Sequence, residues 1–143
     1  MLLLILYLLL FQVIFTDFKY RLIHNSTNIA VLVTSICILL VYKTNLPIPL
    51  LSLYAIMLPV CFLLFYFNIW GGGDAKLVLA LIPALNISVF LEFLLLTSVI
   101  GAMIAVAILL YYKIILNHAI NISVPYGIPI ALSAMYQLYP LWG

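Results

Sequence analysis

Formal charge in this chain is confined to five basic and three acidic residues, and long charge-free stretches separate them. The stretches 22–42, 44–73, 93–112 and 114–143 contain no Asp, Glu, Lys or Arg. A helix of about 20 mostly apolar residues spans the roughly 30 Å hydrocarbon core of a bilayer and satisfies its own backbone hydrogen bonds. Hydrophobic residues make up 69% of the chain, against roughly 45–50% in soluble domains. We therefore expect an all-α, polytopic helix bundle in the cell membrane.

Polar residues, glycines and prolines between the apolar runs mark the expected helix boundaries. They predict about six transmembrane helices, over residues 2–16, 29–42, 50–67, 74–85, 89–112 and 124–141. Pro59 predicts a kink in the third helix. The fourth helix is too short to cross the bilayer unless Ile69 and Trp70 also lie in the membrane. No internal repeat is visible, so residues 1–143 are expected to form a single domain.

The basic residues predict how the chain is oriented in the membrane. Lys19, Arg21, Lys76 and Lys113 fall in the loops after the first, third and fifth expected helices, and only Lys43 falls on the other side. Because Lys and Arg favour cytoplasmic loops, we expect these loops in the cytoplasm and both termini outside it. A net charge of +2 is too small for nucleic-acid binding. Two cysteines and two histidines lack the usual zinc spacing, so no metal is expected.

Asp17, Asp74 and Glu92 are the only acidic residues. Asp17 ends the first expected helix and Asp74 begins the fourth, so two crossings separate them and both should reach the same membrane face. Alone, Asp17 could simply end a helix and Asp74 could cap one. As a pair, two carboxyl groups can share one proton, which gives the base and the acid that aspartyl proteolysis needs. The sequence leaves open which carboxyl is the acid.

Three consecutive glycines, Gly71, Gly72 and Gly73, precede Asp74. Glycine lacks a Cβ and adopts backbone dihedrals that other residues avoid. This stretch is therefore predicted to break the helix and to let an extended peptide lie close to the acids. A flexible turn is the simpler alternative. A phosphate-binding loop is a poor fit, because the Gly-x-x-x-x-Gly-Lys-Ser/Thr spacing is absent.

These motifs resemble those of one protease family. The Gly-Gly-Gly-Asp run at 71–74 resembles the Gly-x-Gly-Asp signature of intramembrane aspartyl proteases, and its Ala-Lys-Leu continuation is similar to that of the type IV prepilin and preflagellin peptidases. The segment 17–25 resembles the first-aspartate motif of this family, with His24 where the family has proline. The Pro-Tyr-Gly segment at 125–127 resembles the entry to its final helix.

The resemblance implies a six-helix peptidase that removes the short basic leader of type IV pilin-like precursors at the cytoplasmic membrane face. It implies that Asp17 and Asp74 form the catalytic pair and that no cofactor is needed. Supporting roles are expected for Lys19, Arg21, Asn25, Lys76, Pro125 and Gly127. The small size is similar to tight-adherence (Tad-type) members, and the paired Cys-x-x-Cys motifs of methylating members are absent. Peptidase activity without methylation is therefore expected, whereas the oligomeric state is left open.

Two side chains near the glycines have simpler expected roles. Lys76 is two positions from Asp74, roughly 200° around a helix, so it should face away from it and reach the headgroups. Trp70 and the tyrosines are expected in interfacial belts.

A second class of function uses the same acids. Intramembrane carboxyl groups often bind protons or cations, so the chain could be a small proton- or cation-coupled transporter or a channel subunit. That interpretation leaves the triple glycine unexplained. A non-catalytic scaffold, the third interpretation, predicts that neutral replacement of Asp17 or Asp74 has no effect.

Overall fold

The computed structural model describes residues 1–42, 48–85, 87–111 and 124–142, and within those ranges every regular element is a helix. The prediction of an all-α bundle is confirmed. The elements are α1 (Leu2–Tyr20), α2 (Asn25–Tyr42), α3 (Ile48–Tyr66), α4 (Gly72–Leu81), α5 (Ile87–Tyr111), α6 (Gly127–Leu138) and the short 3₁₀ helix η2 (Tyr139–Trp142). The expected positions of Lys43 and Lys113 lie outside the described residues.

Three helices are long and apolar enough to cross a membrane: α1, α2 and residues Ser88–Tyr111 of α5. Residues Leu50–Tyr66 of α3 and all of α6 are apolar but shorter. Large apolar side chains also cover the outside of the bundle, such as Phe11 of α1, Phe62 of α3 and Met103 of α5. Such a surface suits contact with lipid chains, because the hydrocarbon core of a membrane is apolar and contains no water. The chain is a membrane protein.

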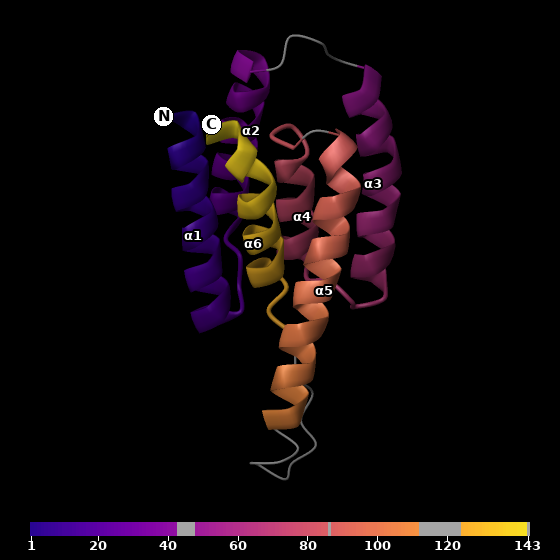
Figure 1. The fold of residues 1–143 in the computed structure, drawn as a ribbon. Coiled ribbons are helices and arrows are strands. Elements are labelled where there is room, and N and C mark those ends of the chain that lie inside the picture. The colour runs from indigo at the N-terminus through magenta and orange to yellow at the C-terminus, as the bar shows by residue number, and fades with distance from the viewer. Residues whose placement is uncertain (43–47, 86, 112–123, 143) are drawn as a thin grey trace.

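Helices α4 and α6, the two shortest α-helices described, occupy the middle of the bundle (Figure 1). Helix α4 packs against α2, α3 and α6, whereas α6 packs against α1, α4 and α5. The 10 residues of α4 rise about 15 Å, half the thickness of the hydrocarbon core. Because protein surrounds this helix, its ends need not reach the lipid headgroups.

The fourth helix differs from its predicted span of 74–85. It begins earlier, at Gly72, and ends earlier, at Leu81. Pro83 lies in the turn that follows, where its ring and missing N–H prevent the helix from continuing. Ile69 and Trp70, which would have to lie in the membrane for this helix to cross it, are in the bend before the helix.

Two other boundaries also differ from the predictions. Helix α1 continues past Thr16 to Tyr20, so Asp17 lies inside its last turn. Arg21 ends the helix with a left-handed backbone (φ 51°), and its N–H donates to the Asp17 carbonyl at 2.9 Å. Helix α2 begins at Asn25, within the polar segment that was expected to be a loop.

Small residues let α6 approach α1 closely. Ala131 and Ala134 of α6 are fully buried, as are Leu6 and Leu10 of α1. Small side chains at helix contacts bring backbones together in membranes. The Tyr7 hydroxyl of α1 donates to the Met135 carbonyl of α6 at 2.6 Å. This contact joins the last turn of α6 to the first half of α1, and the start of α6 lies beside the last turn of α1, where Gly127 packs against Asp17.

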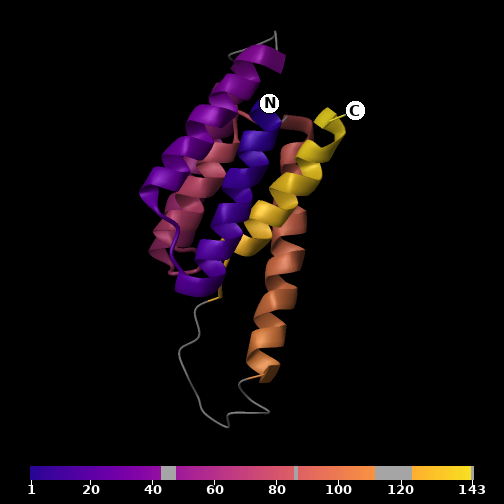
Figure 2. The ribbon, with the colours of Figure 1, turned by 90° about the vertical axis from the view of Figure 1, so that its left-hand side faces the viewer.

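Both chain ends lie at the same end of the bundle, and the last turn of α1 and the first turn of α4 lie at the other (Figures 1 and 2). The last part of α5 extends beyond the other helices at this second end. Helices α2 and α3 separate the two aspartates along the chain, and both aspartates belong to turns at the same end of the bundle. We refer below to this end of the bundle as the aspartate end.

Candidate functional site

Asp17 is buried in the last turn of α1, with 4% of its surface exposed. Its carboxyl packs against Gly127, the first residue of α6, so closely that a Cβ there would lie 2.8 Å from Oδ2. The backbone N–H groups of Gly127 and Ile128 face this carboxyl. No donor among the described residues forms a hydrogen bond of standard geometry with Oδ2. The close approach of α6 to α1 thus holds the Asp17 side chain in place and leaves Oδ2 as an available acceptor.

Asp74 is buried in the first turn of α4, with 9% of its surface exposed. Its Oδ2 accepts a hydrogen bond from the N–H of Gly71 at 3.0 Å. This contact satisfies one of the free N–H groups at a helix start and places a negative group at the positive end of the helix dipole. The capping role considered for Asp74 is therefore real, and it fixes the orientation of the carboxyl.

The two carboxyl groups meet in one cavity of about 430 Å³ at the aspartate end. Asp17 and Asp74 both line it and interact electrostatically with each other. Arg21 and Asn68, which also line it, have left-handed backbones with φ of 51° and 55°. Backbone strain at non-glycine residues tends to gather at functional sites. The fold thus brings two acids that lie far apart in the sequence into one cavity.

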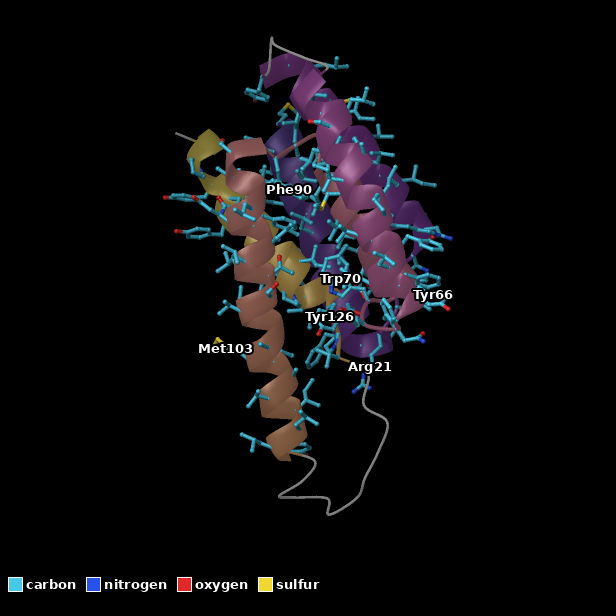
Figure 3. The ribbon with its side chains drawn as sticks, turned by 90° about the vertical axis from the view of Figure 1, so that its right-hand side faces the viewer. Arg21, Tyr66, Trp70, Phe90, Met103 and Tyr126 are labelled. Carbon is cyan, nitrogen blue, oxygen red and sulfur yellow. The ribbon has the colours of Figure 1, made fainter. Side chains whose placement is uncertain are left out.

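Aromatic side chains also line this cavity. Trp70 precedes α4 and Tyr126 precedes α6, and their ring centroids lie 6.5 Å apart at an interplanar angle of 50°. Figure 3 shows the two rings side by side, above Arg21. A Cβ on Gly101 of α5 would lie 3.1 Å from the Tyr126 ring, so Tyr126 is packed tightly against α5. Trp70 therefore contributes to the cavity, beyond the interfacial role expected for it.

The three glycines do not form the extended break that the sequence suggested. Gly71 is extended, with φ −69° and ψ 153°, but Gly72 and Gly73 belong to the first turn of α4. None of the described glycines has a positive φ. A Cβ on Gly73 would lie 3.1 Å from the Cβ of Ile23. Their small size, rather than unusual dihedrals, lets neighbouring chain segments approach Asp74.

The supporting residues divide into two groups. Arg21 and Pro125 line the cavity, and Arg21 interacts electrostatically with Asp17. Lys19 is exposed and lies over the rings of Phe15 and Tyr20, at 5.9 and 5.1 Å from their centroids. Lys19 is therefore held outside the cavity.

Asn25 and Lys76 also lie outside the cavity, where they bind each other. The Lys76 ammonium donates to Asn25 Oδ1 at 3.0 Å. Lys76 thus faces away from Asp74, as its position on the helix predicted. Glu92 is exposed on α5, away from the two aspartates.

Asn28 is a site residue that the sequence interpretation missed. It is 5% exposed, and its Nδ2 donates to the Gly73 carbonyl at 3.2 Å, next to Asp74. Its spacing from Asn25 was a usable signal, because residues three apart share a helix face. Among the described residues, no three His, Cys, Asp or Glu side chains gather as metal ligands would.

Comparison with known proteins gives one match. The sequence model of the type IV leader peptidase family matches residues 4–106, a range that contains Asp17, Asp74 and the glycines between α3 and α4. No curated protein and no solved structure matches the chain significantly.

Proposed function

The chain belongs to the type IV leader peptidase family, and we propose that it is an aspartyl endopeptidase in which Asp17 and Asp74 activate one water molecule. Its substrates are type IV pilin-like precursors, each with a short basic leader followed by a hydrophobic helix. Cleavage takes place at the cytoplasmic membrane face and releases the leader. No cofactor takes part.

One observation carries the proposal: Asp17 and Asp74, from α1 and α4, line the same cavity and interact electrostatically. Burying two acids together is unfavourable unless they share a proton or bind a partner. The chain has only one other acidic residue, so the pairing accounts for two thirds of its carboxyl side chains. A purely structural role for both would leave this arrangement unexplained.

The chemistry follows from the shared proton. The ionised carboxyl removes a proton from water as the water oxygen attacks the scissile carbonyl carbon, and the protonated carboxyl donates to the carbonyl oxygen. The tetrahedral intermediate then collapses: the C–N bond breaks, a proton passes to the departing amine, and the leader leaves with a new carboxylate. Both aspartates return to their starting protonation states.

The remaining cavity walls fit a peptide substrate. Trp70 and Tyr126 offer apolar, aromatic surface in the same cavity as the acids, suited to the side chains that flank the scissile bond. The cavity is lined by the last turn of α1 and the first turn of α4, at the aspartate end. A substrate there can place its leader outside the membrane and its hydrophobic helix within it.

Replacing each aspartate separately tests the proposal. Asp17→Asn and Asp74→Asn keep the side-chain shape but remove the titrating proton, so each should abolish leader removal from a co-expressed prepilin, with at least about a hundredfold loss of rate. Glu92→Gln is the matched control, because it removes the third acid from an exposed position outside the cavity, and it should process normally. Immunoblots of the precursor, the mature pilin and the peptidase itself give the readout.

Two results would contradict the proposal. The first is continued processing in either aspartate variant at unchanged peptidase abundance. The second is proton or cation flux in the absence of substrate that both Asp→Asn replacements abolish while processing continues, which would favour the transporter interpretation.

A further inference from the structure

A second cavity, of about 450 Å³, lies between α2, α3 and α4. It shares no lining residue with the cavity that holds the aspartates. Asn25, Ile29 and Lys76 in its wall are exposed, so it is open to the surroundings of the bundle. We call it the α2–α4 groove.

One end of the α2–α4 groove is polar and positively charged. Asn25 and Asn28 come from the first turn of α2, and Lys76 comes from the first two turns of α4. The Lys76 ammonium has the neutral Asn25 Oδ1 as its hydrogen-bond acceptor at 3.0 Å. None of the three acidic residues, all of them described, lines the groove. The positive charge at this end is therefore available to an anion.

The same end also offers a buried acceptor. Asn28 is 5% exposed and uses its Nδ2 to bind the Gly73 carbonyl, but its Oδ1 is buried with no hydrogen-bond partner in the described structure. A buried amide oxygen without a partner is destabilising, because it has lost its hydrogen bonds to water. A hydroxyl group that enters this end of the groove would satisfy it.

The other end of the groove is apolar. It is lined by Leu32 of α2 and by Leu79 and Ala80 of α4. The Tyr54 hydroxyl adds little polarity there, because it donates a hydrogen bond to the Leu79 carbonyl at 3.0 Å. Leu32 lies seven positions beyond Asn25, about 10 Å further along the helix axis. The groove thus changes from charged to apolar along the direction that leads from the aspartate end into the membrane.

We propose that the α2–α4 groove binds one anionic glycerophospholipid from the leaflet at the aspartate end. The phosphate contacts the Lys76 ammonium, a headgroup hydroxyl donates to Asn28 Oδ1, and an acyl chain lies along Leu32 and Leu79. A lipid in that leaflet has its charge, hydroxyls and chain in this same order.

Substrate is the less suitable occupant of this groove. Lys76 points about 200° away from Asp74 around α4, so the groove lies on the opposite face of α4 from the dyad. A basic leader would also be repelled by Lys76. The lipid proposal is independent of the peptidase chemistry, since neither aspartate takes part in it.

The test measures which lipid the full-length protein retains. The purified chain is equilibrated in mixed micelles that contain equal amounts of phosphatidylglycerol and phosphatidylcholine with matched acyl chains. After gel filtration, bound lipids are extracted and quantified by mass spectrometry. Wild-type protein should retain phosphatidylglycerol about fivefold more than phosphatidylcholine, since one lysine near the surface contributes that much selectivity.

Two pairs of variants locate the binding. Lys76→Gln should abolish the preference for phosphatidylglycerol, whereas Lys19→Gln, which removes an exposed cation at the same end outside the groove, should keep it. Ile29→Trp fills the groove from an exposed position and should reduce retention of both lipids. Ile36→Trp, which is also exposed on α2 but lies outside the groove, should retain them. Far-UV circular dichroism checks that all four variants fold, and Lys76→Gln alone decides the question if a tryptophan variant does not.

Several results would overturn the lipid proposal. Unchanged selectivity in Lys76→Gln, or equal lipid retention in the two tryptophan variants, would exclude this groove. Full displacement of phosphatidylglycerol by glycerol 3-phosphate would indicate a site for a soluble phosphate ester. A photo-crosslinker at position 29 that captures co-expressed prepilin in place of lipid would assign the groove to substrate.

Discussion

Each buried aspartate packs against a glycine that leaves no room for a Cβ. A Cβ at Gly127 would lie 2.8 Å from Asp17 Oδ2, and a Cβ at Gly71 would lie 2.9 Å from Asp74 Oδ2. Real Cβ atoms do not approach other heavy atoms so closely, so a side chain at either position must displace the carboxyl. At the scale of single residues, these two glycines set where the acids point.

Gly127→Ala tests this role of the glycine. The added methyl group would also lie 2.9 Å from Ile23 Cδ1, so the Asp17 carboxyl must move, and a shift of about 1 Å can lower a catalytic rate up to a hundredfold. We expect at least a tenfold lower rate of leader cleavage in isolated membranes, at equal peptidase abundance. Gly72→Ala, whose Cβ would come no closer than 3.4 Å to Phe65, should lose much less. Wild-type cleavage by Gly127→Ala would contradict the account.

Single residues were the easiest part of the site to predict. Only three acids occur in the chain, so the positions of Asp17 and Asp74 could be considered one by one. The contribution of Gly127 followed from resemblance alone, because its contact with Asp17 joins the last turn of α1 to α6. Asn28 was missed because its spacing from Asn25 indicates a shared helix face but not which group that face binds. The unusual dihedrals expected of the glycine run were wrong, because Gly72 and Gly73 are helical and no described glycine has a positive φ. That the run lets a peptide approach the acids stays a prediction.

Two side-chain hydrogen bonds join the first turn of α2 to that of α4. Asn28 Nδ2 donates to the Gly73 carbonyl at 3.2 Å, and the Lys76 ammonium donates to Asn25 Oδ1 at 3.0 Å. Helix α2 follows α1 after a short connection, so these bonds relate the segment that carries Asp74 to the end of α1. At the scale of helices, this link keeps the two acids in one cavity.

Asn28→Asp tests the link as a positioning device. The replacement keeps the side-chain shape but removes the N–H group that binds the Gly73 carbonyl, so the start of α4 should be held less firmly. We expect kcat for leader cleavage to fall about tenfold or more, with KM changed much less, since substrate contacts remain. Thr34→Ala is the control on the same helix, because the Thr34 hydroxyl donates to the Ala30 carbonyl of its own helix. A rise in KM with unchanged kcat would assign Asn28 to substrate binding instead.

Helix number and order were predictable, but helix ends were less so. Apolar runs located the membrane-embedded stretches, yet α1 extends through Asp17 and α2 begins at Asn25, inside the polar segment. Asp17 is buried against Gly127 of α6, and Asn25 Oδ1 accepts a hydrogen bond from Lys76, so a helix can continue where composition predicts a loop. The short α4 differs for a similar reason: α2, α3 and α6 pack against it.

The whole molecule has its chain ends at one end of the bundle and both acids at the other. Lys19, Arg21 and Lys76 all lie at the aspartate end. Cationic side chains favour the cytoplasmic side, so we propose that the aspartate end faces the cytoplasm. The substrate's basic leader would then meet the dyad on the side where precursors are made.

Cysteine labelling in intact cells tests this orientation. In a background in which Cys37 and Cys61 are replaced by alanine, a membrane-impermeant maleimide should label Tyr139→Cys but not Lys19→Cys. Both positions are exposed and they lie at opposite ends of the bundle. After the membrane is permeabilised, both should react. Labelling of Lys19→Cys in intact cells would reverse the proposed topology.

The most direct test of whether the two acids act as one unit is the cleavage rate of purified variants on one prepilin substrate in reconstituted membranes. The variants are Asp17→Asn, Asp74→Asn and the double replacement. Residues that act together lose nearly everything with the first replacement. We predict that the double variant is no slower than either single variant, with all three at the background rate. Substantial cleavage by one single variant, with a further loss in the double variant equal to the product of the separate effects, would contradict the shared mechanism.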